Sequence, residues 1–158
     1  MRVAILTISD SVARGDREDL SGPALAQRCR ELGWEVTSTA RCSDDRANVR
    51  SQLTAVADSN HVDLVLTTGG TGLGPRDNTP EATLDVAERM IPGLAEEMRR
   101  RGMEKTRNAL LSRGVAVVRH GSLIVNLPGS PKGAVESLDA IANLLPHAIQ
   151  VLRGAGHD

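Results

Sequence analysis

Residues 62–80 read VDLVLTTGGTGLGPRDNTP, and this stretch indicates how the chain folds. The apolar run at its start is typical of a buried strand, and Thr79-Pro80 near its end is typical of the first turn of a helix. Glycine occupies four of the six positions from 69 to 74. Because glycine has no Cβ, backbone N–H groups in such a loop can turn toward a ligand and form a concavity that binds anions.

The rest of the chain shows the same alternation. Patterns typical of strands occur at residues 2–8, 35–39 and 62–67, and helical periodicity follows each of them, at 20–32, 43–57 and 79–89. A further helix is expected over 94–101, the apolar runs 114–119 and 122–127 predict a hairpin, and the last helix begins near Lys132. We therefore expect a single domain over 1–158. Its predicted fold class is α/β with three layers: a mainly parallel central sheet with one antiparallel hairpin, and helices on both faces.

Composition argues against several classes of partner. The 158 residues carry a net charge of -1, which gives no reason to expect a nucleic-acid partner. Trp34 is the only Phe, Tyr or Trp, so single-stranded nucleic acid would find almost no stacking platform. Cys29 and Cys42 lack the spacing of a zinc knuckle or a redox pair, and we expect them to be reduced, as in the cytoplasm. No apolar run approaches the length of a membrane span.

The glycine loop matches neither of the common nucleotide-binding fingerprints. A Walker A loop ends in Gly-Lys-Ser/Thr, whereas Gly74-Pro75 stands at that place here. The dinucleotide motif is Gly-x-Gly-x-x-Gly, whereas the glycines at 70, 72 and 74 are spaced by two. An ordinary turn rarely needs so many glycines beside an arginine and an aspartate, here Arg76 and Asp77. We therefore favour a phosphate-binding loop.

Two carboxylates follow the glycine loop. Asp77 has two interpretations, as a turn residue that bonds its own backbone or as a metal ligand. We favour the metal ligand, because a carboxylate beside a phosphate-binding loop is typical of a site for a metal–nucleotide complex. Glu81 falls in the first helical turn, where negative charge complements the helix dipole, and we expect a structural role for it.

Four further aspartates precede predicted helices. Capping explains one of the pair Asp44 and Asp45, and the sequence does not decide which of them. Asp10 and Asp19 flank the loop that follows the first strand, where capping and substrate binding both remain open. The loops after Asn126, Gly69 and Ser9 all leave the carboxyl ends of strands, so we expect them to share one edge of the sheet.

Residues 126–132 read NLPGSPK and form the second informative stretch. Two prolines and a glycine make a rigid turn between a strand and a helix. Ser130, Lys132 and the free amides at the helix start could meet an anion there. The alternative is a stiff strand-to-helix connection, and both interpretations can hold together. Ser112-Arg113 lies just before a strand, where a structural role and a ligand contact are both open.

Several strings together resemble a known family. They are LTISD at 6–10, DLSGP at 19–23, TGGTGLGPRDNTPEAT at 68–83, LSR at 111–113 and NLPGSPK at 126–132. In this combination they resemble the molybdenum-cofactor biosynthesis family that includes the MoaB and MogA proteins. The resemblance spans essentially the whole chain, and the segment Ile91-Pro92-Gly93-Leu94 is also similar to the family.

The resemblance implies a function and a set of site residues. It implies transfer of AMP from ATP to molybdopterin with Mg²⁺, by a homotrimer that passes its product to a molybdate-insertion protein. Asp77 and Asp44 match the catalytic, metal-linked acidic positions, although Ser43 stands where the family usually has proline. The positions that match the phosphate loop and the wall of the pocket are Asp10, Gly69, Gly70, Thr71, Gly72, Ser112, Asn126, Pro128, Gly129 and Ser130. Lys132 is the expected cation of the site, and many relatives carry Asn or Gln at position 130.

Two alternatives belong to other classes. The chain could bind or carry molybdopterin without activating it, but the retained pair Asp44 and Asp77 favours an enzyme. It could also belong with the nucleotide-processing proteins related to competence-induced factors, which carry a similar domain. Those chains are expected to be much longer than 158 residues, and this difference argues against the third interpretation.

Overall fold

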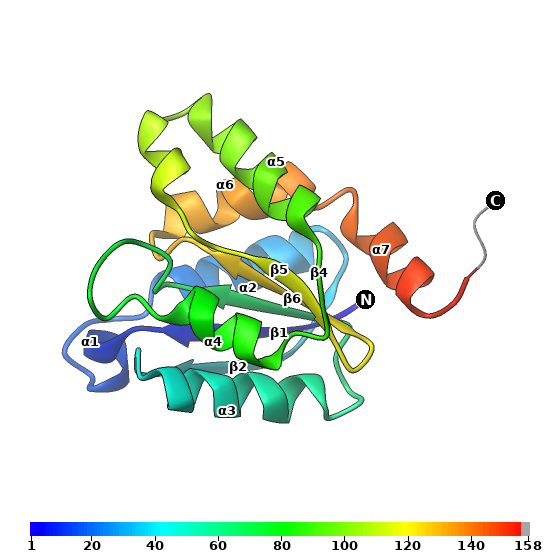
Figure 1. Cartoon of the computed structure of the whole chain (residues 1–158), viewed down its shortest axis with the longest axis horizontal. Coiled ribbons are helices and arrows are strands. Elements are labelled where there is room, and N and C mark those ends of the chain that lie inside the picture. Colours follow the sequence, from blue (N-terminus) through cyan, green and yellow to red (C-terminus); the bar gives the residue numbers. More distant parts are fainter. Residues whose placement is uncertain (156–158) are drawn as a thin grey trace.

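The computed structural model describes residues 1–155 and contains one central sheet. Its strands lie in the order β2-β1-β3-β6-β5-β4 (Figure 1). The strand bounds are β1 Arg2–Ile8, β2 Glu35–Cys42, β3 Leu64–Thr68, β4 Arg89–Met90, β5 Ala116–Arg119 and β6 Ser122–Leu127. Strands β2, β1, β3 and β6 are parallel, whereas β5 pairs antiparallel with both β6 and β4. The predicted α/β class, parallel sheet and hairpin are confirmed.

Helices cover both faces of this sheet (Figure 1). On one face lie α2 Ser21–Glu31, α5 Pro92–Met103, α6 Pro131–Ile141 and α7 Leu145–Leu152, and on the other lie α3 Arg46–Ala57 and α4 Thr79–Val86. Successive residues of β1 feed the two cores in turn: Val3 and Ile5 enter the first, and Ala4 and Leu6 enter the second. Because side chains alternate between the faces of a strand, a strand covered on both sides reads as a continuous apolar run.

Three predicted element ends are wrong. The helix expected to reach Arg89 ends at Val86, and Arg89–Met90 forms the edge strand β4. The last predicted helix divides into α6 and α7, because Pro146 lacks the N–H that a continuous helix would need there. Strand β2 continues past Thr39 to Cys42. None of the helices in residues 1–155 is long and apolar enough to cross a membrane.

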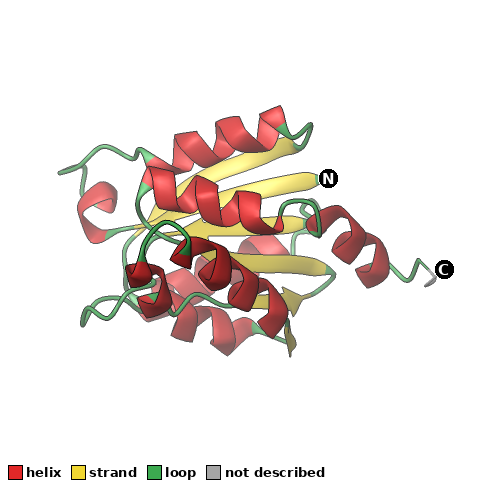
Figure 2. Cartoon of the chain, turned by 90° about the horizontal axis from the view of Figure 1, so that it is seen from above, coloured by secondary structure: helices red, strands yellow, loops and turns green. Residues whose placement is uncertain are grey.

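The parallel strands end almost in line. The register pairs Ile8 with Cys42, and Thr68 with both Thr7 and Leu127. The chain leaves β1 toward β2 on one side and returns to β3 on the other side, so the strand order reverses between β1 and β3. Such a reversal opens a crevice at the carboxyl ends of the strands. The short helix α1 Asp10–Ala13 and the glycine loop begin at this edge, and the N-terminus and α7 lie at the opposite end (Figures 1 and 2).

Candidate active site

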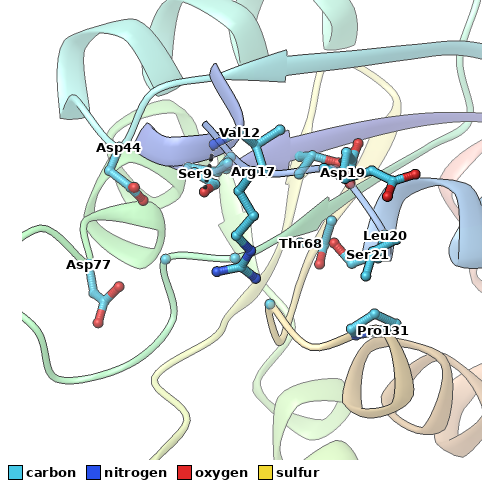
Figure 3. Close-up of a pocket in the computed structure, with 16 residues that line it drawn as sticks. Ser9, Val12, Arg17, Asp19, Leu20, Ser21, Asp44, Thr68, Asp77 and Pro131 are labelled. Atoms are coloured by element: carbon cyan, nitrogen blue, oxygen red, sulfur yellow. Dashed lines mark hydrogen bonds between the residues drawn. The ribbon is translucent and has the colours of Figure 1, made fainter. Parts of the chain in front are cut away.

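A cleft of about 220 Å³ opens at the reversal between β1 and β3. Its walls come from the loop after β1, the glycine loop and the loop after β6, and they include Asp44, Asp77, Gly69, Gly70 and Gly129. Asp44 and Asp77 lie at one end of the cleft, and Asp19 and Ser21 lie at the other (Figure 3). The two acidic residues that the sequence places 33 positions apart therefore line one space.

The first two glycines of the loop are required by close approach of the main chain. Gly69 has a φ of +102°, and a Cβ there would collide with the carbonyl oxygen of Ile8. Gly70 has a φ of +68°, and its Cβ would collide with Oγ1 of Thr79. Any other residue would meet both backbone strain and a steric clash. The loop after β6 crosses this turn, because a Cβ on Gly129 would lie 3.3 Å from the Cα of Gly69.

Asp77 is both a turn residue and a wall of the cleft. Its Oδ2 accepts a hydrogen bond of 2.8 Å from the amide of Gly74, and its own amide donates to the Gly74 carbonyl. The carboxylate is closely wrapped, since a Cβ on either Gly72 or Gly74 would lie 2.9 Å from Oδ2. Its Oδ1 has no hydrogen-bond partner among residues 1–155. One oxygen of Asp77 thus orders the loop, and the other is open to a ligand.

Asp44 is not the helix cap. Asp45 caps α3, because its carboxylate accepts from the amide of Asn48. Asp44 instead accepts from the amide of Asp10 at 2.9 Å, and Asp10 accepts from the amide of Asp44 at 3.0 Å. This exchange ties the ends of β1 and β2 together. Burial raises the pKa of Asp44, and the negative charges of Asp10 and Asp77 raise it further.

The Asp10 carboxylate is bound by another side chain of the protein. Arg76 donates two hydrogen bonds of 3.0 Å to its carboxylate, one to each oxygen. These bonds, and then the backbone bond from Asp44, hold the pKa of Asp10 below its usual range. Asp10 is absent from the residues that line the cleft. Its carboxylate is therefore engaged by the protein, and its geometry supports a role in holding Asp44. Asp19 accepts from the amide of Gly22 in the first turn of α2, and it also lines the cleft.

Arg113 holds the glycine loop from the side of the sheet. Its guanidinium donates to the carbonyls of Gly72 at 2.8 Å and Asp77 at 2.7 Å, and it forms an ion pair with Glu81. Its amide also donates to the carbonyl of Thr71. The ion pair with Arg113 gives Glu81 a structural role, as we expected from the sequence. The ion pair with Arg113 is the main reason that the pKa of Glu81 is lowered.

Asn126 and Ser130 make contacts that support the fold. The amide nitrogen of Asn126 donates to the hydroxyls of Thr67 and Thr83, and its oxygen accepts from the amide of Val115. Asn126 is 2% exposed. Ser130 caps α6 by accepting from the amide of Gly133. These contacts support the interpretation of this stretch as a stiff strand-to-helix connection.

Five of the predicted residues line a second space, on the other side of the glycine loop from the cleft. A wider hollow of about 550 Å³ lies between α6 and the segment formed by α5 and the 3₁₀ helix η1, Arg107–Leu111. The predicted residues on its wall are Thr71, Gly72, Ser112, Pro128 and Ser130. The glycine loop thus separates the cleft from the hollow. The Lys132 side chain is 86% exposed, lies 3.9 Å from Glu136 and lines neither space.

Arg17 was not among the predicted site residues. It lies in the loop between α1 and α2 and lines the cleft, and its side chain extends across the space between the two ends of the cleft (Figure 3). The one available signal was its place in a loop that leaves the carboxyl end of a strand. The roles of Arg76 and Arg113 were missed as well, because they depend on contacts between distant segments.

The donor set of the cleft fits a divalent metal that also binds a substrate phosphate. Among residues 1–155 there is no group of three or more His, Cys, Asp and Glu side chains that could hold a metal ion. Mg²⁺ commonly uses only one or two carboxylates and takes its other ligands from phosphates and water. Asp44 and Asp77 match that requirement, and a cation between them would offset the burial and the mutual repulsion that raise the pKa of Asp44.

Known proteins resemble this chain over nearly its whole length. The family described as "Probable molybdopterin binding domain" matches residues 4–147. A molybdopterin adenylyltransferase of Helicobacter pylori is 37% identical, covering 98% of this chain and 89% of that protein. The one of Escherichia coli K12 is 35% identical, covering 98% and 86%. The crystal structure of the molybdopterin biosynthesis enzyme MoaB from Thermus thermophilus is 49% identical with a TM-score of 0.91, covering 97% of this chain and 96% of that chain.

A more distant likeness concerns the third interpretation. A CinA protein of Thermoplasma acidophilum has a TM-score of 0.69 at 16% identity, covering 91% of this chain and 97% of that chain. At that identity the likeness shows the fold alone. The length argument against the third interpretation is not supported, because that CinA chain is similar in length to this one. Sequence identity argues against it instead, since it is 16% with the CinA protein and 49% with the MoaB protein. The chain belongs to the family of molybdopterin-binding domains that includes the MoaB and Mog proteins of molybdenum cofactor biosynthesis.

Proposed function

We propose that this protein is a molybdopterin adenylyltransferase that uses ATP and Mg²⁺. The observation that carries the proposal is the position of Asp44 and Asp77 at one end of a cleft that the glycine loop also lines. Relatives with the name of that activity are 35–37% identical over 98% of the chain, which supports it. The alternative within the family is a protein that binds molybdopterin without catalysis.

The proposed reaction is an in-line transfer. An oxygen of the terminal phosphate of molybdopterin bonds to the α-phosphorus of ATP, the bond from that phosphorus to the bridging oxygen breaks, and pyrophosphate leaves. Asp44 and Asp77 would hold Mg²⁺, which offsets the charge that develops on the phosphate oxygens. The chain supplies no nucleophile. Its residues orient the two phosphates and provide fixed donors, as in phosphoryl transfer generally.

The two spaces beside the glycine loop suit two substrates. The cleft of about 220 Å³ is smaller than the usual pocket for a drug-sized molecule, and it suits phosphate groups. The hollow of about 550 Å³ falls within the range for such a molecule and suits a ring system. The loop between them would bring phosphates from one space and a bulky group from the other to the same backbone amides.

The test is an assay of the purified protein with ATP, Mg²⁺ and molybdopterin. We expect pyrophosphate release only when molybdopterin is present, together with an adenylylated product. Asp77→Asn should keep the fold and lose turnover by roughly a hundredfold or more. Asp16→Asn is the matched control, because Asp16 is exposed and pairs only with Arg14. Binding of molybdopterin without pyrophosphate release by the wild-type protein would identify a carrier, and near-normal turnover by Asp77→Asn would remove Asp77 from the mechanism.

We also propose a homotrimer in the cytoplasm that hands its product to a molybdate-insertion protein. The support for these three points is the family resemblance. Light scattering during size-exclusion chromatography checks the first of them, with a mass of three chains expected and a mass of one or two chains counting against it. Transfer of the adenylylated product to the insertion protein can be followed by mixing the two purified proteins.

A further inference from the structure

Two arginines that belong to the glycine loop or hold it are already engaged by the protein. Arg76 makes two hydrogen bonds to the Asp10 carboxylate. Arg113 is bound to two carbonyls of the loop and to Glu81. Lys132, which the sequence suggested as the cation of the site, lines neither space. A phosphate in the cleft would therefore have to find its positive side chain elsewhere.

Arg17 is free to provide that charge. It lines the cleft, and among residues 1–155 it has neither a hydrogen bond nor an ion pair through its side chain. Its guanidinium reaches the space between Asp44 and Asp77 at one end and Asp19 and Ser21 at the other (Figure 3). Asp19 forms no ion pair with it, and the Asp19 carboxylate instead accepts from the Thr7 hydroxyl and from a backbone amide of α2.

Other arginines of the chain show what a guanidinium does when a partner is in reach. Arg46, Arg100 and Arg119 each donate two hydrogen bonds to a single carboxylate. Such bidentate pairs with planar anions are the preferred geometry of arginine, and phosphate satisfies it as well as carboxylate does. Arg17 lies in a cleft lined by four acidic residues, Glu18, Asp19, Asp44 and Asp77, and its side chain pairs with none of them. It is placed for a ligand that the cleft takes up.

We propose that Arg17 binds a phosphate group of a substrate in the cleft. The inference rests on the proposed function for the identity of that substrate, which is either ATP or molybdopterin through its terminal phosphate. Asp44 and Asp77 repel such an anion, so the cleft needs positive charge in addition to a divalent ion. Arg17 supplies this charge from the chain itself, and its attraction for phosphate persists when no metal is present.

The test compares Arg17→Gln with Arg17→Lys and with a matched control. Arg14→Gln is the control, because Arg14 belongs to the same loop, is exposed, and pairs with Asp16 outside the cleft. Calorimetry with inorganic pyrophosphate in EDTA measures the contact without turnover. Since one charge-assisted contact is lost, we expect Arg17→Gln to bind about tenfold or more weakly, Arg17→Lys to keep part of the affinity, and Arg14→Gln to match the wild type.

Steady-state kinetics with Mg²⁺ then identify the source of the phosphate. A rise in KM for ATP alone assigns Arg17 to the nucleotide, and a rise in KM for molybdopterin alone assigns it to the pterin phosphate. Unchanged pyrophosphate binding and unchanged KM values in Arg17→Gln overturn the inference and leave the proposed function standing. If the wild type makes no adenylylated product but its pyrophosphate binding still depends on Arg17, the proposed function fails and the phosphate contact stands. Equal melting temperatures of the variants confirm that each one folds.

Discussion

At the residue scale, the site depends on positions where the main chain approaches other groups too closely for a side chain. Gly69 lies against the Ile8 carbonyl, and Gly70 lies against Thr79. Both have positive φ. The sequence showed that the loop needed glycines, because their density was plain. It did not show which contacts required them, since those contacts come from segments that are far apart along the chain.

Replacing Gly70 separates the two reasons for glycine. Gly70→Ala should lower the free energy of unfolding by about 2–4 kcal/mol, because it combines positive-φ strain with a clash against the Thr79 hydroxyl. Gly33→Ala is the control: its φ is +80°, but a Cβ there meets nothing within 4 Å, so it should cost only about 1–2 kcal/mol. Urea unfolding measures both. Equal losses in the two variants would show that the loop relaxes away from Thr79.

Asp44 shows the cost of holding acidic groups together. Burial and the charges of Asp10 and Asp77 raise its pKa, so the folded protein binds a proton there more readily than the unfolded chain does. At pH above that pKa its charge destabilises the fold, and the penalty is relieved as the pH falls through it. Asp44→Asn removes this charge and should melt at the same or a higher temperature than the wild type in EDTA.

The same variant should lose the response to metal. We expect Mg²⁺ with ATP to raise the melting temperature of the wild type clearly and that of Asp44→Asn much less, because a ligand that binds only the folded state stabilises it. Differential scanning fluorimetry with and without EDTA gives both values. A large drop in the melting temperature of Asp44→Asn in EDTA would show that the carboxylate matters mainly for its bond to the Asp10 amide.

At the element scale, most strands and helices followed from local patterns. Strand β1 was predicted at its observed bounds, because a strand with both faces covered is apolar throughout. Strand β4 was missed, since it exists only through hydrogen bonds to β5, from the amides of Glu88 and Ile91 to the carbonyls of Val118 and Ala116. Pairing between distant segments leaves no local periodicity. The order of strands and helices predicts that the loops meet at one edge of the sheet. It does not predict which residues of the different loops form hydrogen bonds and ion pairs with one another.

Asn126 joins three elements near the site. Its side chain bonds to Thr67 of β3, to Thr83 of α4 and to the amide of Val115. Asn126→Ala should lower the free energy of unfolding by about 2–4 kcal/mol, because it leaves buried partners unpaired. Asn143→Ala, at an exposed position, should leave it unchanged. If Asn126→Ala unfolds normally but binds ATP or molybdopterin weakly, then Asn126 contacts the ligand, as the family resemblance implied.

At the scale of the whole molecule, one buried carboxylate joins the start of β1 to the residue that follows α7, far from the cleft. The Asp63 side chain is 5% exposed and pairs with Arg2 and Arg153. Its carboxylate also accepts from the backbone amide of Arg2 at 2.7 Å. It thereby holds the first strand and the segment after α7 at the edge opposite the glycine loop (Figure 2). No local pattern predicts this contact, because Asp63 precedes an ordinary buried strand.

This contact should make stability depend on pH. Burial alone would raise the pKa of Asp63, but the bonds from Arg2 and the charge of Arg153 outweigh it and lower the pKa. A carboxyl whose pKa is lower in the folded state stabilises the protein above its unfolded pKa, which is about 3.9, and that stabilisation is lost as the pH falls through the folded value. Asp63→Asn should therefore unfold more easily than the wild type at pH 7, by about 1–3 kcal/mol.

The difference in free energy of unfolding between the wild type and Asp63→Asn should shrink steadily as the pH falls from about 5 toward the pKa of Asp63 in the folded protein. The wild-type carboxyl then becomes neutral as well. Urea midpoints measured across this range give the comparison, with Asp16→Asn as an exposed control that should follow the wild type throughout. A difference that stays constant down to the lowest pH at which the protein folds would show that Asp63 acts through the shape of its hydrogen bonds and not through its charge. Because the cleft lies at the other end of the strands, turnover of folded Asp63→Asn at pH 7 should match that of the wild type.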